Sequence, residues 1–459
     1  MLRRKVYDRL VRWKDDPDRL SLLIRGPGQI GKTYIIERFA KDHYDDCLRL
    51  DFHSNPELAG LFEGSIEPDR LIPRLEMYFD RGIEPGRTLL FFDEIQVCSR
   101  ARASLKYFSL DKRYHVVASG SLLGVKHRLG TGDSTESDST NLCIPLGYEE
   151  SITMHAMDFE EFLWARGINP KTVDEIRDNI RNGVPFNEVI LDKINRLFFD
   201  FMIVGGMPEA VQRYVDTGSH KSYQNIHDRI LEDCRGDILK YAPSSQVVKT
   251  SFCFDSIPNQ LSESNKKFHF SRIDGQLSRK AASTYSENLL WIKGAGYGNF
   301  CMFLNDLSKP LVSRIQRDSF KVYFYDTGLL MHHYGPGSAK ALVEGDVSYN
   351  FGALAENIVM ECLVKSGIEP MTYRKNSGSG RMELDFVLDL GGRTVVVEVK
   401  SGRHREHPSL SKVDSVFEVD RKILLGLSNI SREGDVECYP LFAAAFMDVW
   451  DTGWDDLDA

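Results

Sequence analysis

The stretch GPGQIGKT, from Gly26 to Thr33, has the spacing GxxxxGK[ST] and lies between a short apolar run and an amphipathic helical pattern within residues 21–40. Glycines in such a turn let backbone amides curl around an anion, and the start of the helix adds partial positive charge. Lys32 would reach the β- and γ-phosphate oxygens, and Thr33 would bind magnesium. We therefore predict a site for ATP and Mg²⁺, made by Gly26, Pro27, Gly28, Gln29, Ile30, Gly31, Lys32 and Thr33.

A second apolar run ends in two carboxylates. TLLFFDE, residues 88–94, carries Asp93 to the end of a predicted buried strand, where it would hold the magnesium shell. Glu94 beside it would orient the attacking water. An Asp-Glu pair after an apolar strand is by itself more often an ordinary strand end, but beside the glycine-rich loop it indicates a hydrolysis site.

Strand and helix patterns alternate through the first third of the chain. Apolar strands are predicted at 47–52, 88–94 and 114–121, with helical patterns between them, and this order favours a parallel α/β sheet. From residue 158 to 242 the apolar spacing is helical throughout, which predicts a helical lid. Residues 243–335 mix short helical patterns with one strand, FKVYFYDTGLL.

Near the C-terminus, Gly391-Gly392 separates two apolar runs, MELDFVLDL and RTVVVEVK. Two glycines suit a two-residue hairpin turn because both can adopt positive φ. That turn places Asp385 opposite Glu398 and Glu383 opposite Lys400, with all these side chains on one face of the hairpin. Because like charges directly opposite destabilise a sheet, we expect Asp385 and Glu398 to bind a divalent cation, Mg²⁺ or Mn²⁺.

A simpler interpretation of the same hairpin stays open. Glu383 and Lys400 would then form a cross-strand ion pair, while Asp385 and Glu398 splay into solvent.

A basic stretch, NKKFHFSRIDGQLSRK, lies in the middle of the chain. It interleaves phenylalanines with basic side chains, a pattern typical of contact with DNA and equally of a solvated helix face. Since the net charge is −9, nucleic acid would have to bind such a local patch. The residues concerned are Lys266, Lys267, Phe268, Phe270, Arg272, Arg279 and Lys280.

These motifs together resemble a bacterial and archaeal AAA+ ATPase family. The resemblance follows the chain in order through LLIRGPGQIGKT, FFDEIQ, SGSLLG, MDFEEFLWA, VGGMPEAVQRYV, DILKYA, YFYDTGLL and MELDFVL with VVVEVKSG. Members of that family join a P-loop domain to a C-terminal domain of unknown function with a PD-(D/E)xK nuclease-like core. One departure is Gly28, where the family usually has arginine, so a charge is missing from the loop.

The resemblance also implies roles for individual residues. In the nuclease-like pattern Asp385 and Glu398 are the metal ligands, Lys400 steadies the nucleophile or the leaving charge, and Glu356 completes the site. Ser119 and Ser121 lie near the position of a polar residue that senses the γ-phosphate in related ATPases, although both hydroxyls would serve equally well as caps of the next turn. Candidates for an arginine finger are Arg100, Arg102 and Arg128, each of which is also interpretable as a solvated charge.

The sequence hypothesis is thus an α/β protein with four parts: a P-loop AAA+ core (1–157), a helical lid (158–242), a winged-helix-like segment (243–335) and a PD-(D/E)xK nuclease-like domain (345–459). Its expected function is Mg²⁺-dependent ATP hydrolysis coupled to DNA binding or cleavage. The alternative is a nucleotide-switched binding module whose nuclease-like domain is inactive and recognises a partner. Expected partners are ATP, DNA, and a homo-oligomer or another protein.

The same residues lead us to expect a cytoplasmic protein without a membrane segment. No apolar run approaches the roughly 20 residues of a membrane span, and the N-terminal MLRRKVYDRLVRWKDD has no apolar stretch to serve as a signal peptide. The eight cysteines are scattered and have no zinc-ligand spacing.

Overall fold

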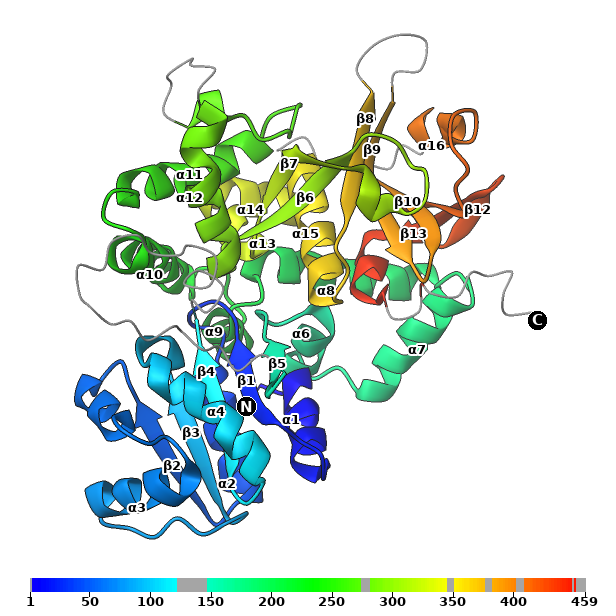
Figure 1. The fold of residues 1–459 in the computed structure, drawn as a ribbon. Coiled ribbons are helices and arrows are strands. Elements are labelled where there is room, and N and C mark those ends of the chain that lie inside the picture. Colours follow the sequence, from blue (N-terminus) through cyan, green and yellow to red (C-terminus); the bar gives the residue numbers. More distant parts are fainter. Residues whose placement is uncertain are drawn as a thin grey trace. The chain divides into compact units, whose positions relative to one another are not determined.

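A computed structural model of the chain describes residues 2–121, 147–273, 281–344, 351–375, 382–401, 408–447 and 450. The residues fall into two compact units, which are described separately (Figure 1). The first unit comprises 3–155 with 294–296, and the second comprises 156–293 and 297–459 together with residues 1–2. In the part of the chain that is described, no helix is both long enough and apolar enough to cross a membrane.

The first unit is built on a five-stranded parallel sheet, drawn in blue to cyan in Figure 1. This confirms the predicted parallel α/β sheet. Its strands, in spatial order, are β2 (Asp46–Asp51), β3 (Thr88–Asp93), β4 (His115–Gly120), β1 (Ser21–Arg25) and β5 (Glu149–Thr153). Its helices are α1 (Lys5–Asp15), α2 (Lys32–His43), α3 (Pro68–Phe79) and α4 (Ser99–Asp111), with short 3₁₀ turns η1 (Pro56–Phe62) and η2 (Ile95–Val97).

The burial of the strands agrees with their positions in the sheet. Every residue of β3 and β4 is buried, as central strands with both faces covered require. One core contains side chains from β2, β3, α3 and α4, among them Leu50, Phe92, Leu75 and Phe108. Since the strands are parallel, their carboxyl ends meet at one edge, where β1 runs into the glycine-rich loop and β3 ends at Asp93.

The second unit is built on an eight-stranded mixed sheet. Its order is β12 (Ser431–Glu433), β13 (Val436–Pro440), β11 (Arg421–Gly426), β10 (Arg393–Val399), β9 (Met382–Leu390), β8 (Met371–Lys375), β6 (Gly298–Leu304) and β7 (Ile315–Phe324). The short 3₁₀ turns after residue 156 are η3 (Phe270–Arg272), η4 (Leu311–Arg314) and η5 (Leu441–Ala445). The helices after residue 156 are α6 (Phe159–Ala165), α7 (Pro170–Arg181), α8 (Glu188–Val204), α9 (Pro208–Thr217), α10 (Gln224–Tyr241), α11 (Val247–Leu261), α12 (Ala281–Ala295), α13 (Thr327–His333), α14 (Pro336–Val343), α15 (Phe351–Lys365) and α16 (Pro408–Val413).

Two strands of this sheet come from the segment predicted to be winged-helix-like. The sequence hypothesis assigns β6 and β7 to a winged-helix-like segment, 243–335, apart from the C-terminal domain. In the structure β6 pairs in parallel with β8, so both strands extend the sheet that holds the C-terminal hairpin. The last six residues of β7, Lys321 among them, are all buried, as expected of a strand covered by the rest of this unit. The predicted helical region, 158–242, is helical and belongs to the same unit.

The C-terminal hairpin has the predicted register. Gly391 and Gly392 have φ values of 59° and 84°, so each uses the left-handed region open to glycine. The last pair of the ladder is Val397 and Phe386, so the same register continued by one residue brings Glu398 opposite Asp385.

A buried polar network fixes α15 in this unit. The Lys365 ammonium donates to the Glu361 carboxylate at 2.6 Å, and the same carboxylate accepts from the backbone and hydroxyl of Thr327, at 2.8 and 2.7 Å. Because each buried polar group has a partner, the position of α15 relative to α13 is strongly specified. The helix that carries Glu356 is therefore fixed to α13 by this network.

Candidate functional site

The glycine-rich loop joins β1 to α2 and has the backbone that anion binding requires. Gln29 and Gly31 have φ values of 61° and 87°, which turns successive backbone amides toward one side. A β-carbon at Gly26 would lie 2.1 Å from the Met154 carbonyl oxygen, so only glycine fits where the loop leaves the sheet. The loop therefore forms a concavity of amides at the N-terminus of a 12-residue helix.

Lys32 supplies the positive charge of this loop. Its side chain is buried, and its ammonium donates to the carbonyl oxygens of Gly26, at 3.0 Å, and Pro27, at 2.7 Å. The ammonium is thus held over the loop by hydrogen bonds that phosphate oxygens, which are stronger acceptors, can replace.

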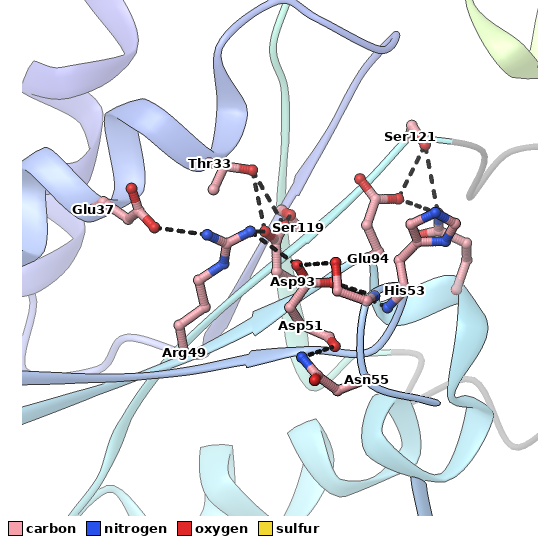
Figure 2. A network of polar contacts seen from close by, with 12 residues as sticks. Thr33, Glu37, Arg49, Asp51, His53, Asn55, Asp93, Glu94, Ser119 and Ser121 are labelled. Carbon is pink, nitrogen blue, oxygen red and sulfur yellow. Dashed lines mark hydrogen bonds and ion pairs between the residues drawn. The ribbon is translucent and has the colours of Figure 1, made fainter. Parts of the chain in front are cut away.

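Thr33 and Asp93 lie together as the predicted magnesium site requires (Figure 2). The Thr33 hydroxyl lies 3.1 Å from Oδ2 of Asp93, and the Ser119 hydroxyl donates to Oδ1. Asp93 is 1% exposed. A hydroxyl and a carboxylate oxygen side by side are hard ligands of the type Mg²⁺ prefers, so the donor set fits this metal.

Glu94 and Ser121 form a second contact at the same edge. Glu94 has a left-handed backbone, φ 53° and ψ 46°, which turns its side chain away from that of Asp93. Its carboxylate accepts from the Ser121 hydroxyl at 3.2 Å and from the Gln96 amide. From the sequence, Ser119 and Ser121 are either sensors of the γ-phosphate or caps of the next turn. In the structure Ser119 contacts Asp93, and Ser121 contacts Glu94.

Arg49 is a site residue that the sequence analysis missed. From β2 its guanidinium contacts Oδ2 of Asp93 at 2.6 Å, Asp51 at 3.2 Å and Glu37 at 2.9 Å (Figure 2). Burial by itself would lower the pKa of Arg49, but these carboxylates raise it, so the guanidinium stays charged. The signal was present in CLRLDF, where strand periodicity puts Arg49 and Asp51 on one face beside the strand that carries Asp93.

Two of the arginine-finger candidates have partners within the first unit. Arg100 donates to the carbonyl oxygen of Phe62 at 2.7 Å, and Arg102 forms a 2.8 Å ion pair with Glu149. Arg128 lies outside the described residues. The structure therefore selects no arginine finger among them.

The hairpin carboxylates of the second unit lie in a cluster with basic side chains. Lys400 contacts Glu398 at 2.7 Å, and Oδ2 of Asp385 accepts from the Val399 amide at 2.9 Å. From α15, Glu356 accepts from the Lys266 ammonium at 2.5 Å and from the Tyr323 hydroxyl at 3.0 Å. Asp385, Glu398, Lys400 and Glu356 are thus part of one cluster.

Lys321, on β7, is a member of this cluster that the sequence analysis did not identify. It is 1% exposed and lies 3.4 Å from Glu383 and 3.8 Å from Glu356. Lys400 pairs with Glu398, not with the opposing Glu383, so the predicted simple ion pair is not the one formed. The sequence around a single lysine in a strand does not indicate that its side chain is buried. The carboxylates that pair with Lys321 come from α15 and from the hairpin, which are distant in sequence.

Burial and charge shift the pKa values of this cluster in different directions. Burial, with repulsion from Glu356 and Glu398, raises the pKa of Asp385 well above its usual value. Burial also raises the pKa of Glu398, and Lys400 only partly opposes this. For Glu356 burial acts in the same sense, but Lys266 and Lys321 outweigh it and lower the pKa.

Asp385 and Glu398 are the carboxylates of this cluster that were predicted to bind a metal ion. Oε2 of Glu398 is buried and has no hydrogen-bond partner among the described residues, which is the state of a ligand oxygen awaiting a cation. Within the same described ranges, however, no three His, Cys, Asp or Glu side chains form a group suited to hold a metal ion. Asp385 and Glu398 therefore fit as ligands only if other donors complete the shell.

The predicted basic patch is partly internal. Lys266 contacts Glu356, and Phe268 is buried with its ring 5.9 Å from that of Phe320. Arg272 pairs with Glu263. Arg279 and Lys280 lie outside the described residues, so what the structure shows of the patch is mainly packing.

Comparison with known proteins agrees with the geometry of the first unit. Residues 18–163 match a family model described as an AAA domain. This segment resembles an AAA domain. The match supports a P-loop ATPase domain, with ATP binding and hydrolysis as its activity. Residues 195–339 and 351–441 match two further models, each described as a domain of unknown function.

Other comparisons add little. No curated protein matches the chain. A Walker-type ATPase of Pyrococcus abyssi is 14% identical, with a TM-score of 0.39, over 72% of this chain and 95% of that one. The ORC1 protein of Aeropyrum pernix in complex with DNA is 11% identical, with a TM-score of 0.31, over 75% of this chain and 93% of that one. TM-scores this low do not establish a common fold, so we infer nothing from these two structures.

Proposed function

We propose that the chain is a Mg²⁺-dependent ATPase whose site lies at the edge of the first unit's sheet. The observation that carries the proposal is the contact between the Thr33 hydroxyl and the Asp93 carboxylate, directly beside the amide concavity and Lys32. The loop amides and Lys32 bind the phosphates, and Thr33 and Asp93 hold the metal. When bound, Mg²⁺ supplies charge neutralisation at the transferring phosphoryl group.

Glu94 is the residue that orients the attacking water. Its carboxylate already accepts from Ser121 and Gln96, and these two donors fix the direction of the carboxylate. A fixed carboxylate holds a water molecule and accepts its proton more effectively than a mobile one. Ser121 is therefore a positioning residue for Glu94 as well as a candidate contact for the γ-phosphate.

The first test is the Lys32→Ala variant. We expect it to lose ATP binding by at least roughly tenfold, because a charged donor to the phosphates is removed. Binding is measured by calorimetry with ATP and Mg²⁺. Lys41→Ala, which removes an exposed lysine from the same helix, is the matched control and should bind like the wild type. Equal affinity in Lys32→Ala and the wild type would show that the site is assigned wrongly.

For the second unit we propose a function in a DNA transaction, by binding or cleavage, and two observations favour different versions. The buried oxygen of Glu398 that has no hydrogen-bond partner, in a carboxylate that repels Asp385, supports a metal-dependent nuclease. The buried Lys321 beside Glu356 supports an inactive domain that only recognises a partner, since the lysine already supplies a cation. DNA, a homo-oligomer or another protein remain proposals as partners, because a nuclease-like site does not fix function.

A metal titration separates these versions. In a Lys32→Ala background, which removes nucleotide at the first site, the nuclease version predicts that Mn²⁺ raises the melting temperature through binding to the folded state. Adding Asp385→Asn with Glu398→Gln should lower the rise without unfolding the protein, because the side-chain shapes are kept, and the rise that remains belongs to Thr33 and Asp93 at the first site. A rise that the double substitution leaves unchanged, and no cleavage of single-stranded, double-stranded or branched DNA with and without ATP, would leave the binding version.

A further inference from the structure

Asp93 has a cation beside it that does not belong to the magnesium site. The Arg49 guanidinium lies 2.6 Å from Oδ2, the same oxygen that lies 3.1 Å from the Thr33 hydroxyl (Figure 2). Oδ1 accepts from Ser119. A metal ion bound by Thr33 and Asp93 would therefore compete with the Arg49 guanidinium for Oδ2 of Asp93.

Arg49 has other partners on its far side. Glu37, on α2, lies 2.9 Å from Nη1, and Asp51, at the end of β2, lies 3.2 Å from Nη2. Nη2 contacts both Asp51 and Asp93, so the guanidinium can move away from Asp93 and keep its contact with Asp51. Arg49 is also about a third exposed, with 36% of its side chain accessible, whereas the Asp93 side chain is only 2% exposed.

We propose that Arg49 is a displaceable internal counter-ion that sets the Mg²⁺ requirement of the nucleotide site. It holds the buried Asp93 carboxylate in place until a metal–nucleotide complex arrives, and it then leaves Asp93 while it keeps Asp51 and Glu37 as partners. This inference rests on the ATPase function proposed above and adds a residue that controls its metal dependence.

Two physical arguments indicate that Mg²⁺ displaces Arg49 from Asp93 and that the Arg49–Asp93 ion pair is not permanent. Leaving a buried carboxylate without a partner is costly, so Asp93 needs a cation both before and after nucleotide binds. Two positive charges on one carboxylate oxygen repel each other, so the guanidinium and Mg²⁺ compete for it. Arg49 keeps two carboxylate partners after it leaves Asp93, which makes its release inexpensive.

The test measures how Mg²⁺ affects nucleotide binding. Affinity for ATP is measured by calorimetry at increasing free Mg²⁺, and the Mg²⁺ concentration at half-maximal enhancement is compared between variants. Arg49→Gln should need roughly tenfold less Mg²⁺ than the wild type, because one charge-assisted competitor is removed. With MgCl₂ alone, the melting temperature of Arg49→Gln should rise more than that of the wild type.

Two further variants make the result specific. Arg81→Gln removes the same charge from an exposed ion pair with Asp46 in the same unit, and its Mg²⁺ dependence should match the wild type. Arg49→Lys keeps the charge and the fold, and its midpoint should lie between those of the wild type and Arg49→Gln. If wild type and Arg49→Gln have equal midpoints while ATP binding still depends on Lys32, the Arg49 proposal is overturned and the ATPase proposal stands. If Lys32→Ala binds ATP normally, it is the ATPase proposal that fails.

Discussion

Replacing Glu94 by glutamine is expected to leave ATP binding close to that of the wild type while slowing ATP hydrolysis by roughly 10²- to 10³-fold. The amide has the shape of the carboxylate and still accepts from Ser121 and Gln96 through its oxygen. It cannot accept a proton from the attacking water at neutral pH. The effect therefore falls on the chemical step and not on binding.

The measurement is the steady-state turnover number together with the ATP dissociation constant for each protein. Glu57→Gln, at an exposed position of the same unit, is the control and should change neither quantity. A normal turnover number in Glu94→Gln would move the catalytic role to another residue, with Asp93 or Gln96 as the next candidates. Weakened binding together with slow turnover would instead indicate that Glu94 supports the loop.

The arrangement of the proposed nucleotide site was predictable because its residues are close in sequence to the elements that position them. Gly26 to Thr33 follow β1 directly, and Asp93 ends an apolar strand, so local patterns fix where these groups lie. The hairpin register was predictable for the same reason, since Gly391-Gly392 determines which residues face each other.

The residues that sequence analysis missed are basic partners from distant segments. Arg49 and Lys321 have no motif, and each is identified only by the carboxylates that tertiary packing brings to it. The place of β6 and β7 was missed because strand pairing across a long helical insertion leaves no local signal. Composition and residue spacing cannot show that strands from two predicted domains belong to one sheet.

Lys321→Met is expected to lower the free energy of unfolding by about 3 kcal/mol, the usual cost of breaking a buried ion pair by removing one partner. Methionine has a similar length and no charge, so the variant removes the cation near Glu356 and Glu383 with little change in volume. The measurement is urea unfolding at neutral pH. Lys340→Met, at an exposed lysine of α14, is the matched control and should unfold like the wild type.

The pH dependence of this deficit follows from the carboxylates left behind. In the wild type, burial opposes ionisation of Glu356, but Lys266 and Lys321 lower its pKa, so its stabilising contribution is present above the unfolded-state pKa and is lost on acidification through the folded-state pKa. Without Lys321 that pKa rises, so ionisation of Glu356 stabilises the variant less than the wild type as pH increases. The difference between Lys321→Met and the wild type should therefore be largest at neutral pH and shrink toward the ordinary carboxylate range, about pH 4 to 5. A variant as stable as the wild type at neutral pH would show that Lys321 is not needed to balance the cluster, and the case for an inactive, lysine-neutralised domain would fail with it.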